Sequence, residues 1–153
     1  SSYMHHFAKV KDLDFGFESN YNPGLAYNNS KLYTIWMTRY LARKFFLNGS
    51  SITVNSYHPG LIATNLVNNS DTKPTKKSVL GHTMKPIPKR LDEGIKTGYY
   101  LSLSEEISGL TGYYFDDKKV KAVSEKGYTF EKAQKLMDYC QEKIELFKAR
   151  QDV

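Results

Sequence analysis

Helix and strand patterns alternate along this chain, and the alternation restricts its fold more than any other feature. Residues 24–48 carry apolar side chains at helical spacing, and a strand pattern follows directly over residues 51–57. Residues 91–104 predict a second helix, and residues 109–115 predict a second short strand. Alternation of this kind is typical of an α/β layer built on a parallel sheet.

The segments between and after these elements complete the predicted order. Thr129 is a residue type that favours the N-terminal cap, and the apolar stripe behind it predicts a last helix that runs to about Arg150. Residues 3–23 are polar and mixed, so we expect a loop there. The stretch from Gly60 to Arg90 is polar, and we interpret its basic part, between Lys73 and Arg90, as a solvated flap.

Two parallel strands do not make a stable sheet, because parallel sheets are covered on both faces and contain several strands. We therefore expect residues 1–153 to be one part of a larger domain, with the other strands in a preceding half. The chain opens on Ser1-Ser2 without an initiator Met, and its sequence contains no Gly-rich phosphate-binding turn. Both observations agree with that expectation.

Composition limits the classes of function. The net charge is +6, but the 22 Lys and Arg residues are dispersed among 16 acidic residues, so a primary role in nucleic-acid binding is not expected. Cys140 is the only cysteine, which fits a reducing compartment, and no apolar run is long enough to span a membrane. We expect a cytoplasmic protein. His5 and His6 are adjacent, which is poor geometry for one metal ion, and no metal site is predicted.

Tyr27 and Lys31 form the first chemically informative pair. Their spacing places them on one face of the first helix, one turn apart. There the ammonium can stabilise a phenolate, which makes a tyrosine usable as a general acid or base near neutral pH. The spacing alone is a weak signal. It gains weight because the helix leads to a strand that ends at Pro59-Gly60, a turn that permits close approach of the backbone to a ligand.

The order of these motifs resembles that of the classical short-chain dehydrogenase/reductase family. Their residues resemble those of its retinol-dehydrogenase-like branch. The matching stretches are YNPGLAY at 21–27, SKL at 30–32, HPG at 58–60 and TGYYF at 111–115. The resemblance covers essentially the whole chain. It implies the C-terminal half of a Rossmann-type, doubly wound α/β domain, with the dinucleotide-binding half absent from residues 1–153.

The resemblance also implies catalytic roles. Tyr27 would be the general acid/base that gives a proton to the substrate oxygen or takes one from it. Lys31 would support the Tyr27 phenolate and bind the nicotinamide ribose. Ser2 would hydrogen-bond the substrate oxygen. His58 is interpreted as a packing residue, because Tyr27 already fills the acid/base role.

The cofactor implied by the resemblance is NADP or NAD, with NADP favoured by the branch. The residues that would pack on its nicotinamide end, together with Tyr27 and Lys31, are Pro59, Gly60, Ile62 and Thr64.

The implied function is transfer of a hydride between NAD(P)(H) and an alcohol or carbonyl, on a lipophilic small molecule. Two alternatives stay open: a non-catalytic fragment or diverged member that acts as an interaction module, and a basic nucleic-acid-binding protein. The helix of residues 24–48 carries apolar groups on more than one face, which predicts a homodimer paired through that helix. The groups concerned include Tyr33, Trp36, Met37 and Tyr40.

Overall fold

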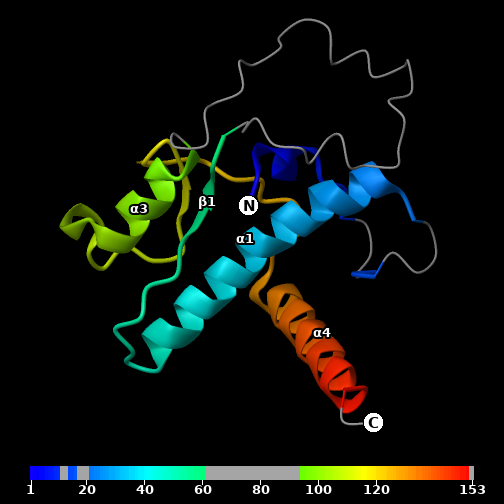
Figure 1. The fold of residues 1–153 in the computed structure, drawn as a ribbon. Coiled ribbons are helices and arrows are strands. Elements are labelled where there is room, and N and C mark those ends of the chain that lie inside the picture. Colours follow the sequence, from blue (N-terminus) through cyan, green and yellow to red (C-terminus); the bar gives the residue numbers. More distant parts are fainter. Residues whose placement is uncertain (11–13, 17–20, 61–93, 152–153) are drawn as a thin grey trace, which may run out of the picture.

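The computed structural model describes residues 1–10, 14–16, 21–60 and 94–151, and Figure 1 shows its fold. In chain order the elements are the 3-10 helix η1 (Tyr3–Phe7), α1 (Pro23–Leu47), β1 (Ser56–His58), α3 (Lys96–Leu103), the 3-10 turn η3 (Glu105–Ile107), β2 (Tyr114–Asp116), β3 (Lys119–Val120) and α4 (Phe130–Ala149). The long helix α1 crosses the molecule, with α3 and the sheet on one side of it and α4 on the other (Figure 1). The protein is therefore mixed α/β.

Local signals determine the ends of α1. The Asn22 side chain caps the helix by accepting a hydrogen bond from the Leu25 N–H at 2.9 Å, and Pro23 occupies the first turn, where no N–H partner is needed. The helix ends at Leu47, and Gly49 follows with a φ of 67°, a left-handed conformation that suits glycine. The predicted helix over residues 24–48 is thus confirmed to within one residue at each end.

The sheet confirms the predicted parallel pair and adds a third strand. β1 pairs parallel with β2, with Ser56 opposite Tyr114. β2 then turns back through Asp117 and Lys118, both at positive φ, and pairs antiparallel with β3. The third strand was not predicted, because its two residues are too few to carry an alternating pattern.

β1 is shorter than the strand predicted over residues 51–57. Before Ser56, the Gly112 N–H donates to the Val54 carbonyl at 2.7 Å, and the other bonds come from side chains. The Thr111 hydroxyl accepts a hydrogen bond from the Val54 N–H at 2.9 Å. The Asn55 side chain donates to the Leu110 carbonyl at 2.7 Å and accepts from the Tyr113 N–H at 3.0 Å. Residues before Ser56 are thus held beside residues 110–113, which precede β2, without regular strand geometry.

The other predicted elements agree with the structure only in part. α4 begins directly after its cap Thr129, whose side chain accepts from the Lys132 N–H at 3.1 Å, as predicted. The expected loop over residues 3–23 is wrong at its start, because η1 forms there. α3 (Lys96–Leu103) lies within the helix predicted over residues 91–104, and residues 91–93 lie outside the described part of the chain.

The core lies where α1 meets η1 and α4. Its most deeply buried members include Leu32, Trp36 and Ala133, each with no exposed surface. Tyr33 and Tyr40 are 7% and 4% exposed, and both pack in this same core. Tyr33, Trp36 and Tyr40 are therefore covered by the protein's own chain, whereas Met37 is only partly buried. The homodimer itself stays a prediction.

Candidate active site

Tyr27 and Lys31 lie together near the start of α1. The Lys31 Nζ is 4.8 Å from the centroid of the Tyr27 ring, within the range of a cation–π contact. The Tyr27 side chain is 42% exposed, so its phenol can reach a bound molecule. The structure thus brings together the pair that the spacing predicted and presents it at the surface.

The N-terminal serines pack against this part of α1. The Ser1 hydroxyl donates to the Lys31 carbonyl at 2.9 Å, and the Ser1 nitrogen donates to the Tyr57 carbonyl in β1 at 2.9 Å. Ser2 follows as the cap of η1, with its hydroxyl accepting from the Met4 N–H at 3.3 Å. Ser1 therefore joins α1, β1 and the segment that carries Ser2 at one place.

Pro59 and Gly60 follow directly after the carboxyl end of β1. Gly60 has a φ of 87°, a conformation that L side chains rarely adopt, and its missing side chain leaves room for close approach to a ligand. The role of the Pro-Gly turn at a cofactor stays a prediction. Ile62 and Thr64, the other two residues predicted to bind the cofactor, lie outside the described residues, as does most of the basic stretch up to Arg90.

His5 holds the backbone at Ser2, a role that the sequence did not suggest. Its side chain is completely buried, and its Nδ1 lies 2.6 Å from the Ser2 carbonyl oxygen. Burial lowers the pKa of His5, although the bond to Ser2 acts in the opposite direction. The sequence pattern predicted a loop at this histidine, because the i to i+3 spacing of a short 3-10 helix gives no hydrophobic period to detect.

Asn29 is the second residue that sequence analysis missed. It lies between Tyr27 and Lys31 in α1, is 4% exposed, and pairs with the main chain of Lys9. Only its place inside the Tyr-x-x-x-Lys motif could have drawn attention to it.

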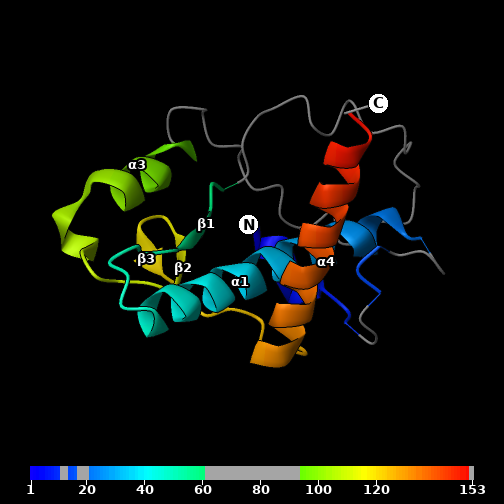
Figure 2. The same ribbon diagram turned by 90° about the horizontal axis from the view of Figure 1, so that it is seen from below.

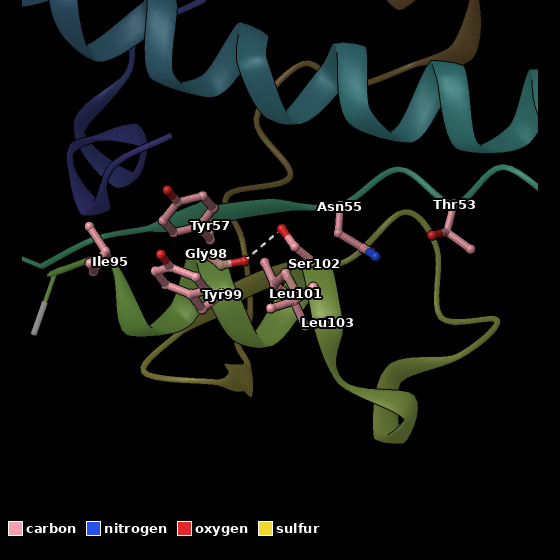
Figure 3. Close-up of a pocket in the computed structure, with 9 residues that line it drawn as sticks. All are labelled: Thr53, Asn55, Tyr57, Ile95, Gly98, Tyr99, Leu101, Ser102 and Leu103. Carbon is pink, nitrogen blue, oxygen red and sulfur yellow. Dashed lines mark hydrogen bonds between the residues drawn. The ribbon is translucent and has the colours of Figure 1, made fainter.

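A shallow groove lies between the β1 segment and α3 (Figure 3). It has a volume of about 600 Å³ and includes three residues that precede or belong to β1, namely Thr53, Asn55 and Tyr57. Across from them stand apolar residues of the α3 segment, including Ile95, Tyr99 and Leu103. Tyr27 and Lys31 are not among its lining residues, so the groove is separate from the proton-transfer pair.

Two further properties concern only the part of the chain that the structure describes. No helix in it is long and apolar enough to cross a membrane. No group of three or more His, Cys, Asp or Glu side chains in it is arranged to hold a metal ion.

The chain is similar in sequence to several named proteins. Retinol dehydrogenase 14 of Homo sapiens is 33% identical over 148 residues, which cover 97% of this chain and 44% of the relative. Retinol dehydrogenase 12 of Homo sapiens is 33% identical over 89% of this chain and 41% of its own length. Short-chain dehydrogenase TIC 32 B, chloroplastic, of Brassica napus is 32% identical over 91% of this chain and 43% of its own. The chain spans less than half the length of these curated relatives.

The solved structures add a likeness of fold. An uncharacterized protein from Mycobacterium paratuberculosis matches with a TM-score of 0.50 and 24% identity, over 74% of this chain and 34% of that one. No family model matches the chain.

Proposed function

Because this chain is a partial sequence of the short-chain dehydrogenase/reductase family, similar to its retinol dehydrogenases, we propose that it belongs to an NAD(P)-dependent oxidoreductase. The reaction is hydride transfer between the nicotinamide cofactor and an alcohol or carbonyl. One observation carries the proposal: the Lys31 ammonium lies 4.8 Å from the Tyr27 ring at an exposed site, beside the serine segment and β1.

In this proposal residues 1–153 are the C-terminal half of a Rossmann-type domain with a doubly wound parallel sheet. The parallel pairing of β1 with β2 supports it. So does the far edge of β1, where the Ser1 nitrogen already makes one bond of the kind that a neighbouring strand makes. The preceding half of the domain would supply the remaining strands and the glycine turn that binds the pyrophosphate.

The residues present fit a dinucleotide at its nicotinamide end. Gly60 has the positive φ and the missing side chain that close backbone approach requires. Lys31 presents an ammonium that can bind ribose hydroxyls, and Pro59 adds an apolar surface. The cofactor supplies the hydride chemistry, while the protein orients the reactants.

The chain's own residues move the proton. Tyr27 gives its phenolic proton to the substrate oxygen in reduction, or takes one from it in oxidation. The positive charge of Lys31 stabilises the phenolate between turnovers. Ser2 holds the substrate oxygen through its hydroxyl.

A lipophilic substrate is proposed for two reasons. The relatives named retinol dehydrogenases act, by their names, on an apolar alcohol. The short helix η1, directly after Ser2, presents apolar and aromatic side chains to the surface, with Tyr3 56%, Met4 38% and Phe7 44% exposed. These side chains can contact an apolar molecule whose oxygen reaches Ser2 and Tyr27.

The test is the substitution Tyr27→Phe in the full-length protein. It removes the transferable proton and leaves the ring, so turnover of an aldehyde or ketone substrate with NADPH should fall by about two to four orders of magnitude. Affinity for NADPH should change little. Tyr99→Phe is the matched control, because Tyr99 is 61% exposed on α3 and should keep normal turnover. Near-normal turnover of Tyr27→Phe would remove Tyr27 from the mechanism.

The alternative function is an interaction module without catalysis. Exposed apolar residues on α3 and along the groove favour it, because they could receive another segment. A full-length protein that binds no NADPH and turns over no carbonyl substrate would support this alternative. Binding to DNA or RNA with a steep dependence on salt would instead support the nucleic-acid alternative.

A further inference from the structure

We propose that Asn29 is a positioning residue of this site: it holds the segment that carries Ser2 (residues 1–9) in place against the helical turn between Tyr27 and Lys31. The inference rests on the proposed function, because it assigns a role within the same site.

The Asn29 side-chain amide bonds to the main chain of one residue of the segment, through both its oxygen and its nitrogen. The Lys9 N–H donates to the Asn29 Oδ1 at 2.9 Å, and the Asn29 Nδ2 donates to the Lys9 carbonyl at 3.1 Å. Two bonds to the main chain of one residue restrict its orientation as well as its distance. The Asn29 side chain is 4% exposed, so water competes little with these bonds.

The other end of the segment is attached to the same part of α1. The Ser1 hydroxyl donates to the Lys31 carbonyl at 2.9 Å, and Ser2 is the next residue. Residues 1–9 are therefore anchored at both ends to the turn that carries Tyr27 and Lys31. Loss of either anchor lets Ser2 shift relative to the phenol of Tyr27, and in the proposed function both side chains contact the same substrate oxygen.

Loss of the Asn29 anchor should loosen the segment without unfolding it. Lys126 still holds it, because its Nζ donates to the His6 carbonyl at 2.7 Å and to the Ala8 carbonyl at 3.2 Å. Ala8 also stays in the core. The expected consequence is a small displacement of Ser2, and a misplacement of about 1 Å can cost roughly 100-fold in rate.

The first experiment compares Asn29→Ala with Thr34→Ala in the full-length protein. Thr34 is a matched control, because it lies on α1 and is exposed, and its hydroxyl donates to the Ser30 carbonyl of its own helix. With NADPH and a carbonyl substrate, kcat of Asn29→Ala should fall by about 10- to 100-fold, and the dissociation constant of NADPH should stay within about twofold. The Lys9 amide should exchange hydrogen faster in Asn29→Ala only. Unchanged kcat in Asn29→Ala would overturn the proposal.

A second variant covers the case in which Asn29→Ala does not fold. In Asn29→Asp a carboxylate can accept from the Lys9 N–H, but it repels the Lys9 carbonyl, whereas the protonated acid can both accept and donate. Its kcat, divided by that of the wild type at each pH, should therefore rise as the pH falls from 8 to 5. A flat ratio would overturn the proposal, because a purely structural defect has no reason to follow this protonation.

Tyr27→Phe, measured alongside, separates the two proposals. If Tyr27→Phe loses turnover and the Asn29 variants keep it, only the positioning role of Asn29 is wrong. If Tyr27→Phe keeps turnover, the proton-transfer role of Tyr27 is wrong, and the role of Asn29 is wrong with it. If the wild-type full-length protein turns over no carbonyl substrate with NADPH, the proposed function itself is wrong.

Discussion

At the scale of single residues, buried polar side chains hold the backbone around the candidate site. His5 is the clearest case, because its Nδ1 and its backbone N–H both bond to the Ser2 carbonyl, at 2.6 and 3.2 Å. Its imidazole also packs edge-on against the Tyr114 ring, with the ring centroids 5.0 Å apart. Burial favours the neutral imidazole, so protonation of His5 should compete with folding.

The pH dependence of stability should show this competition. The pKa of His5 is lowered in the folded protein from its ordinary value of 6.5, mainly by burial. The unfolded chain therefore takes up a proton as the pH falls below about 6.5, while the folded protein resists protonation until its lower pKa is reached. The free energy of unfolding should decline across that window.

The substitution His5→Asn tests the source of the decline, because it keeps a side-chain N–H donor and removes the titratable group. Urea unfolding at several pH values between 7.5 and 5 should give a shallower decline for the variant than for the wild type. Parallel curves for the two proteins would show that His5 is not responsible, whatever the absolute stability of the variant.

At the scale of elements, α4 shows how tertiary contact divides one apolar stripe into two parts. Its first half packs on α1, where Ala133 and Leu136 are buried. Its second half extends beyond that contact, as Figure 2 shows, and leaves Ile144, Leu146 and Phe147 48–62% exposed. The same helical pattern thus contributes to the core along only part of its length.

Two leucines of α4 allow a matched test. Leu136 is 3% exposed and Leu146 is 49% exposed. Leu136→Ala should lower the free energy of unfolding by about 2–5 kcal/mol, because it removes buried methyl groups and leaves a cavity. Leu146→Ala should change it by less than about 0.5 kcal/mol. Chemical denaturation of both variants provides the measurement, and equal losses would contradict the packing of α4 on α1.

At the scale of the whole molecule, the described sheet is short, and apolar side chains beside it are exposed to solvent. β1 has three residues, and the groove beside it has exposed apolar walls, with Ile95 47%, Tyr99 61% and Leu103 74% exposed. Apolar surface of this kind costs free energy in water. A parallel sheet is normally covered on both faces and paired along its length.

We therefore expect residues 1–153 alone to melt without a sharp transition and to bind NADPH only weakly. The physical reason is that the edge of β1 and the face of α3 would stay in water, and the pyrophosphate would lack a helix N-terminus with its glycine turn. A thermal melt and an NADPH titration of the isolated chain make the test. A cooperative melt together with micromolar binding would contradict the proposal that these residues are half of a larger domain.

Sequence reasoning located α1, α4, the parallel pair β1–β2 and the Tyr27–Lys31 pair. It did not find η1, the strand β3 or the roles of His5 and Asn29. The aromatic residues of α1 show the limit most plainly, since they can face a partner or the protein's own chain, and periodicity cannot distinguish the two. Here α4 and η1 cover them.

The features that the sequence determined by itself depend on residues that are close together in the chain. The caps Asn22 and Thr129 bond to N–H groups three residues away, and the spacing of Tyr27 and Lys31 is a property of any helix. The contacts that shape the candidate site join residues far apart, as Asn29 joins Lys9 across 20 positions and Ser1 joins Tyr57 across 56. Such contacts exist only after the elements have packed, because their geometry depends on every element between the two partners, and so only the tertiary structure decided them.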